Sequence, residues 1–133
     1  MAVGALALTS AGCSDIVSGL GGYNNIEGSY DLRTFNGYSL PAVSYQDSFQ
    51  QHYLLDETFT IYSDGTYTDD YTVRIYSANG AQTTQNYRDV GTWQQNGSAI
   101  QFRDQDTGDI FNGSITGGTL TVSQLGDVYV YQR

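Results

Sequence analysis

Apolar and polar residues alternate along most of the chain from Tyr30 onward, and short turn sequences interrupt this alternation. β-branched and aromatic residues dominate the alternating runs, and Asn-Gly, Asp-Gly and Gly-Gly pairs separate them. A two-residue period places apolar side chains on one face of a strand, and no long stretch follows the 3.6-residue period of an amphipathic helix. The pattern therefore predicts an all-β chain built from hairpins.

The clearest predicted hairpin joins a strand over Tyr53 to Tyr62 with a strand over Thr66 to Ser77. Between them, Asp64-Gly65 supplies the positive φ angles that a tight turn needs. The alternation assigns one apolar face to this pair, formed by Leu55, Phe59, Ile61, Tyr67, Tyr71, Val73 and Ile75.

Further strands follow from the same pattern, and Tyr45 to His52 is expected to be a connecting loop or a short helix. Together the runs give about eight to nine antiparallel strands in succession. Closing them into an up-and-down β-barrel removes exposed sheet edges. The remaining predicted strands are Tyr30 to Phe35, Tyr38 to Val43, Thr83 to Gln95, Ser98 to Gln105, Ile110 to Ile115, Thr119 to Gln124 and Val128 to Arg133.

The first thirteen residues have the character of an export segment. Ala2 to Gly12 is an uncharged run of small and apolar residues that is too short to span a bilayer, and it leads directly into Cys13. The sequence Ser10-Ala11-Gly12-Cys13 resembles the lipobox of bacterial lipoproteins, which implies cleavage before Cys13 and lipidation of its thiol. The alternative is that this run packs on the barrel and Cys13 is a buried thiol.

Three regions are therefore expected. Residues 1–13 form the export segment, and residues 14–28, rich in Gly, Ser and Asn, form a flexible tether. Residues 29–133 form one barrel domain, because a chain of 133 residues has room for a single core. The expected location is outside the cytoplasm, at the outer membrane or cell surface or in the extracellular medium.

The charge balance restricts the possible partners. The chain has a formal net charge of -9 and no lysine. Nucleic acids and anionic lipids bind clustered positive charge, so neither is expected as a partner, and membrane contact is expected only through a lipid anchor. Because Cys13 is the single cysteine, the fold has no intrachain disulfide.

Few residues offer catalytic chemistry. His52 is the only histidine, so sites built from several His or Cys ligands are excluded, and neither a catalytic residue nor a cofactor is expected. Glu57 and Asp69 share the parity of the apolar face of the central hairpin. They either form a buried structural network, with an arginine or a tyrosine hydroxyl as partner, or act as a hydrolase pair. The hydrolase alternative requires both carboxyls to face one open cleft.

Two further features suggest binding sites. Asp104, Asp106 and Asp109 surround a glycine in the way that calcium loops place oxygen ligands, although an exposed acidic turn has the same spacing. Aromatic residues on the inward face would accept a small apolar or ring-bearing ligand, unless they fill the barrel completely. The aromatic residues expected to line the barrel are Tyr67, Tyr71, Trp93, Phe102, Phe111, Tyr129 and Tyr131. Of these, Tyr67, Tyr71, Trp93, Phe102 and Tyr129 are the candidate ligand contacts.

A family resemblance rests on short motifs spread over the predicted barrel. They are Asn36-Gly37 with Leu40-Pro41, Asp64-Gly65-Thr66-Tyr67, Gly91-Thr92-Trp93 with Ile100 and Phe102, Leu120-Thr121-Val122, and Tyr131-Gln132-Arg133. In this order they resemble bacterial lipocalin-like envelope proteins. The resemblance implies a non-catalytic exported barrel, a lipoprotein of the cell envelope that binds a small molecule or an envelope component. The alternative is a secreted structural subunit that self-assembles into fibres by adding its N-terminal segment as a strand to another copy.

Overall fold

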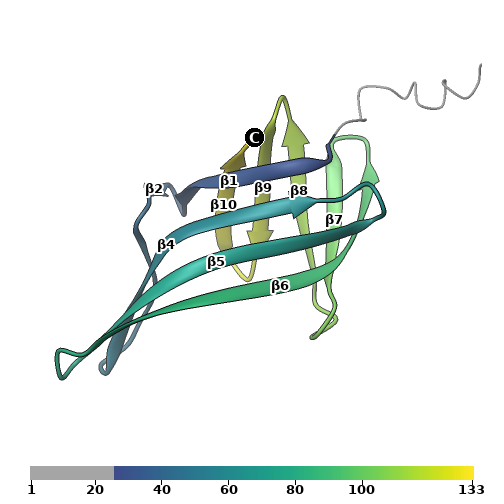
Figure 1. Ribbon diagram of the computed structural model, residues 1–133. Coiled ribbons are helices and arrows are strands. Elements are labelled where there is room, and N and C mark those ends of the chain that lie inside the picture. The colour runs from purple at the N-terminus through teal and green to yellow at the C-terminus, as the bar shows by residue number, and fades with distance from the viewer. Residues whose placement is uncertain (1–25) are drawn as a thin grey trace, which may run out of the picture.

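A computed structural model describes residues 26–133, which form ten strands and contain no helix (Figure 1). Within this range there is accordingly no helix that is long and apolar enough to cross a membrane. The strands are β1 (Gly28–Phe35), β2 (Tyr38–Ser39), β3 (Ala42–Gln46), β4 (Gln50–Ile61), β5 (Thr66–Ser77), β6 (Gln82–Asn96), β7 (Ala99–Asp104), β8 (Ile110–Thr116), β9 (Thr119–Gln124) and β10 (Asp127–Gln132).

Eight of these strands close into an antiparallel barrel in the order β1-β10-β9-β8-β7-β6-β5-β4. The circuit is completed by β1 and β4, whose paired residues run from Gly28 opposite Ile61 to Asp31 opposite Thr58. The short strands β2 and β3 add to β1 and β4 outside this circuit. The structure confirms the predicted up-and-down barrel, and closure pairs the edges that an open sheet would expose.

Three consecutive strands are much longer than the others and project beyond the barrel (Figure 1). β4 and β5 have 12 residues each and β6 has 15. β7 pairs with β6 only from Gly91 to Asn96, so the first half of β6 continues outward beside β5 without β7. One end of the barrel is therefore extended on one side by β4, β5 and β6, with β3 paired to the start of β4.

An aromatic plug fills the middle of the barrel. We use this name for the buried rings of Phe59, Tyr67, Phe102, Phe111 and Tyr131. Phe59 stacks on Tyr67 with ring centroids 4.9 Å apart and meets Phe102 edge-to-face at 4.9 Å. Offset and edge-to-face arrangements of this kind are favourable beyond the apolar area they bury. The ring contacts link all five residues into one connected cluster.

The central hairpin differs from its prediction at one position. β4 contains a β-bulge, because Leu54 pairs with Val73 and Asp56 pairs with Thr72, which leaves Leu55 without a partner on β5. A bulge adds one residue and reverses the inward and outward alternation on one side of it. Leu54 is therefore the buried leucine, and the assignment of Leu55 to the apolar face was wrong.

The segment Tyr45 to His52 was expected to be a loop or a short helix, and this was also wrong. It contains the end of β3, a tight turn and the start of β4. Asp47 organises the turn, because its Oδ1 accepts hydrogen bonds from the backbone amides of Phe49 and Gln50 at 2.7 and 2.9 Å. These two bonds satisfy the backbone amides of the turn, so the chain can reverse direction within a few residues and no helix is needed.

The folded part also begins earlier than residue 29. Ile26 is buried in the core, and its carbonyl accepts a hydrogen bond of 2.6 Å from the hydroxyl of Tyr30. The carbonyl of Glu27 accepts one of 2.8 Å from Nη1 of Arg133. Residues 26–28, which were assigned to the tether, thus make contacts with the barrel.

Candidate functional site: an acidic cavity beside the aromatic plug

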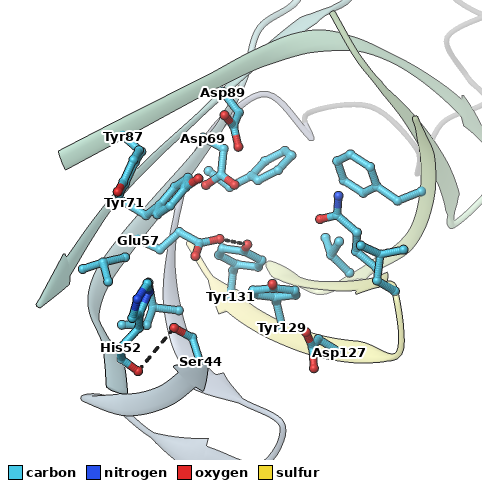
Figure 2. Close-up of a pocket in the computed structure, with 17 residues that line it drawn as sticks. Ser44, His52, Glu57, Asp69, Tyr71, Tyr87, Asp89, Asp127, Tyr129 and Tyr131 are labelled. Carbon is cyan, nitrogen blue, oxygen red and sulfur yellow. Dashed lines mark hydrogen bonds between the residues drawn. The ribbon is translucent and has the colours of Figure 1, made fainter. Parts of the chain in front are cut away.

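A cavity of about 410 Å³ lies beside the aromatic plug, at the end of the barrel from which β4, β5 and β6 project (Figure 2). Side chains of β3 to β6 form one part of its wall, and those of β8 to β10 form the other. The lining residues are Ser44, His52, Leu54, Glu57, Phe59, Asp69, Tyr71, Val73, Tyr87, Asp89, Phe111, Val122, Gln124, Leu125, Asp127, Tyr129 and Tyr131.

Strand register explains why polar side chains gather on this wall. Residues directly opposite each other in an antiparallel pair project from the same face. Glu57 of β4 is opposite Tyr71 of β5, and Tyr71 is opposite Tyr87 of β6. Asp69 is likewise opposite Asp89. The inward face of three adjacent strands therefore carries two neighbouring rows of carboxyl and phenol groups.

Glu57 and Asp69 form the most unusual contact in the cavity. Glu57 is only 5% exposed, and its Oε1 accepts a hydrogen bond from the hydroxyl of Tyr131 (Figure 2). Its carboxyl lies near that of Asp69, and each group shifts the pKa of the other. Burial raises the pKa of Glu57 to about 7, against the lowering effect of Tyr131 and Asp69, and nearby Asp89 and Asp56 add to the rise.

The pKa of Asp69 is raised well above its usual range, first by burial and then by the neighbouring charge of Glu57. One of its oxygens, Oδ1, is buried and has no hydrogen-bond partner among the described residues. Nε2 of His52, on the same cavity wall, is buried and unpartnered as well. Leaving a buried polar atom unpaired costs about 1–3 kcal/mol, so such atoms call for an explanation.

The charge around the cavity is one-sided. Four carboxyl groups line it, those of Glu57, Asp69, Asp89 and Asp127, and none of the five arginines is among the lining residues. Burial, with a smaller contribution from Asp104, also raises the pKa of Asp89. No group of three or more His, Cys, Asp and Glu side chains in residues 26–133 is arranged to hold a metal ion.

The residues that sequence analysis assigned to a ligand lie in three places. Tyr71 and Tyr129 line the cavity. Tyr67 and Phe102 are fully buried in the aromatic plug, where each ring contacts other rings. Trp93 is outside the cavity lining, and its Nε1 donates a hydrogen bond of 2.9 Å to the carbonyl of Tyr62. The structure thus brings two of the five residues together at one cavity.

The acidic turn after β7 is stabilised by its own backbone. Oδ1 of Asp104 accepts hydrogen bonds from the amides of Asp106 and Thr107 at 2.8 and 2.9 Å. Thr107 Oγ1 accepts one of 3.1 Å from the amide of Asp109. The candidate calcium ligand Asp104 is therefore occupied as a turn cap. The candidate lipidation site, Cys13, lies outside the described residues.

Sequence analysis did not assign six of the polar lining residues to the cavity. They are Ser44, His52, Tyr87, Asp89, Gln124 and Asp127. Predicting how β5 and β6 pair would have identified Tyr87 and Asp89, because each lies directly opposite an inward-facing residue of β5. Asp127 had no such local signal, since closure of the barrel places β10 next to β1.

Comparisons with known proteins add a structural resemblance only. No family model matches the chain, and no curated protein matches it. Among solved structures, the chain is similar to an uncharacterized protein from Bacteroides eggerthii, with 13% sequence identity and a TM-score of 0.41. The alignment covers 80% of this chain and 98% of that one.

Proposed function

We propose that this chain is a non-catalytic, exported β-barrel of the lipocalin-like kind that binds a small molecule in the cavity beside the aromatic plug. The observation that carries the proposal is the cavity itself, of about 410 Å³, which combines aromatic walls with two unpartnered buried polar atoms. Small-molecule sites have this size and this mixture of apolar lining with a few convergent polar groups. A barrel filled entirely by its own side chains would have neither.

The contact between Glu57 and Asp69 favours binding over hydrolysis. Glycosidases place their two carboxyl groups about 5–9.5 Å apart, so that the scissile bond or a water molecule fits between them. Here the two carboxyls project from the paired strands β4 and β5 onto one part of the cavity wall, and Tyr131 holds Glu57 by a hydrogen bond. Two carboxyls on the same wall suit groups that hold a ligand's polar end, whereas a hydrolase pair flanks the bond that it cleaves.

A neutral fluorescent probe, N-phenyl-1-naphthylamine, tests whether the cavity accepts small molecules. We expect its emission to rise and shift to the blue with the native protein. Val73 lines the cavity, so Val73→Phe should fill part of it and weaken probe binding by about tenfold. The matched control is Val128→Phe at an exposed position of β10, which should leave binding unchanged. Equal binding by native protein and Val73→Phe would contradict the proposal.

The export part of the proposal rests on the residues before Cys13. We expect the mature protein from a bacterial host to begin at an acylated Cys13, and Cys13→Ala to abolish the added lipid mass. Intact-mass spectrometry of the membrane fraction measures both. A mature chain that retains residues 1–12 and binds a second copy would instead favour the fibre-subunit alternative.

A further inference from the structure

We propose that the ligand of this cavity is a small organic cation, an amine with an aromatic or aliphatic body whose ammonium group is held by Glu57 and Asp69. This inference rests on the proposed small-molecule function and specifies the chemical class of the ligand. It follows from three features of the cavity: an unpaired buried oxygen, an excess of carboxyl groups, and tyrosine rings around them.

The unpaired oxygen indicates where the ammonium group lies. Oδ1 of Asp69 is buried on the cavity wall with no hydrogen-bond donor among the described residues, while the neighbouring Glu57 has Tyr131 as a donor. An ammonium group carries three N–H donors and no acceptor. Placed against the two carboxyls, it donates to Oδ1 of Asp69 and compensates the negative charge that the pair acquires when it loses its protons.

Electrostatics favour a cation over the other classes of ligand. Asp89 lies opposite Asp69, and Asp127 also lines the cavity, whereas no arginine does. An anion would add to this repulsion, and a neutral molecule would leave the carboxyl cluster uncompensated. A metal ion is disfavoured because no three acidic or histidine side chains in the described part of the chain converge on one point.

The tyrosines complete a site for an organic cation. Tyr71 and Tyr87 are stacked with centroids 5.2 Å apart, and Tyr129 is stacked with Tyr131 at 6.3 Å. One pair comes from β5 and β6 and the other from β10, and Glu57 is opposite Tyr71 and hydrogen-bonded to Tyr131. Tyrosine faces attract cations by about 0.5–2 kcal/mol and also pack against the ligand's carbon body.

Binding should release protons from the carboxyl pair. Glu57 has a pKa of about 7 in the empty cavity, and that of Asp69 is raised as well, so the empty site holds protons that a cation displaces. Affinity for an amine that stays protonated in this range should therefore increase as pH rises through about 7. The other titratable groups around this pair are His52, Asp56, Tyr71, Asp89, Asp127, Tyr129 and Tyr131. Tyrosines stay neutral in this pH range.

Three probes of nearly equal shape test the inference by isothermal titration calorimetry. They are 2-phenylethylamine as the cation, 2-phenylethanol as the neutral analogue and 3-phenylpropanoate as the anion. We expect the amine to bind at least about tenfold more tightly than the alcohol, and the anion not to bind. The amine should bind more tightly at about pH 8 than at about pH 6, where it remains charged.

Matched variants assign the effect to the carboxyl pair. Asp69→Asn should weaken amine binding by at least about 30-fold and leave 2-phenylethanol binding within about twofold. The control Asp70→Asn makes the same change at the next residue, whose carboxylate faces outward and pairs with Arg88, so amine binding should be unchanged. Circular dichroism confirms that both variants are folded. Glu57→Gln provides a second test and should remove most of the pH dependence.

The possible outcomes separate this inference from the proposed function. Equal affinity for the amine and the alcohol overturns the cation assignment while leaving a small-molecule site. A preference for 3-phenylpropanoate overturns it as well. If the amine does not bind at all, the assignment is also wrong, and the neutral naphthylamine probe then shows independently whether the cavity is open.

Discussion

Glu57 illustrates how a single buried group links the stability of this barrel to its chemistry. A carboxyl inside a barrel wall is tolerated when it is neutral or hydrogen-bonded, and Glu57 has both options through its raised pKa and its bond from Tyr131. The same property makes its protonation responsive to pH. At the proposed amine site, stability and binding would therefore depend on the same proton.

The stability of the protein should fall as pH rises from about 4.5 to about 7. The pKa of Glu57 is 4.5 in the unfolded chain and about 7 in the folded one, so only the folded state keeps its proton in this window. The stabilising effect is complete below about pH 4.5 and is lost as pH rises through the folded pKa. The loss is on the order of 1–3 kcal/mol in the free energy of unfolding, measured by urea titration at several pH values.

Glu57→Gln should reduce this pH dependence to the part that Asp69 contributes, because an amide has no proton to lose while its oxygen still accepts the hydrogen bond from Tyr131. Asp56→Asn is the comparison at the adjacent exposed position of β4, and it should retain most of the slope, because the charge of Asp56 is the smallest of the causes that raise the pKa of Glu57. A slope that persists unchanged in Glu57→Gln would assign the effect to another group.

Gly91→Ala should destabilise the barrel by about 1–3 kcal/mol or more. A Cβ atom at this position would lie 2.0 Å from the carbonyl oxygen of Arg103 and 2.6 Å from Cε1 of Tyr67, a ring of the aromatic plug. Neither the paired strand nor the packed ring has room to move. Thr92→Ala at the next, exposed position should change stability by less than about 0.5 kcal/mol, and thermal unfolding compares the two.

At the level of elements, the bulge in β4 decides which side chains reach the cavity. Leu54 and Glu57 are three positions apart, so in a regular strand without a bulge their side chains would face opposite sides of the sheet. The bulge allows both to face the interior. β4 thus contributes apolar packing at Leu54 and a carboxyl group at Glu57 within one strand.

The turn between β1 and β2 should be sensitive to the side chain of Asn36. Asn36 has a φ of 51°, its Nδ2 donates to Asp127 at 2.9 Å, and its Oδ1 accepts from the amide of Val128 at 2.8 Å. Asn36→Gly keeps the backbone conformation and loses both bonds, at a cost of about 1–2 kcal/mol. Asn36→Ala adds the strain of a left-handed backbone and should cost about 1–2 kcal/mol more.

Urea unfolding of these two variants checks the prediction. Equal stability of Asn36→Gly and Asn36→Ala would mean that backbone strain contributes nothing at this turn. Stability equal to that of the native protein in both would mean that Asn36 does not fasten β1 to β10.

For the molecule as a whole, closure between β1 and β4 makes a single cooperative unit from strands that are distant in sequence. Residues 26–31 contribute a buried isoleucine, a fully buried tyrosine and the pairing with the end of β4. β1 also pairs with β10, so the first strand joins both ends of the sheet. The N-terminal part of the barrel is therefore required for closure, although it is short.

Truncation should locate the start of the domain. A chain that begins at residue 26 keeps every described core residue and is the reference for the comparison. A chain that begins at residue 28 loses buried Ile26 and the acceptors for Tyr30 and Arg133, and should be less stable by about 2–4 kcal/mol. Equal stability of the two chains would contradict this boundary.

Local patterns predicted most of the fold and only part of the site. The hairpin of β4 and β5 follows from alternating residues around Asp64-Gly65, because both the period and the turn are encoded within a few positions. The prediction of a loop or short helix from Tyr45 to His52 was wrong, because a single acceptor, Asp47, makes the turn so compact that strands continue on both sides of it. At the site, Tyr71 and Tyr129 were recognised as inward-facing aromatic residues.

The sequence alone determined the all-β character, the positions of the turns and the excess of negative charge, because these depend on neighbouring residues and on composition. Tertiary structure decided the rest. It placed the bulge at Leu55, buried Tyr67 and Phe102 away from the cavity, and brought Tyr131 of β10 against Glu57 of β4. Contacts between strands far apart in sequence depend on closure and shear of the whole sheet, which no local pattern specifies.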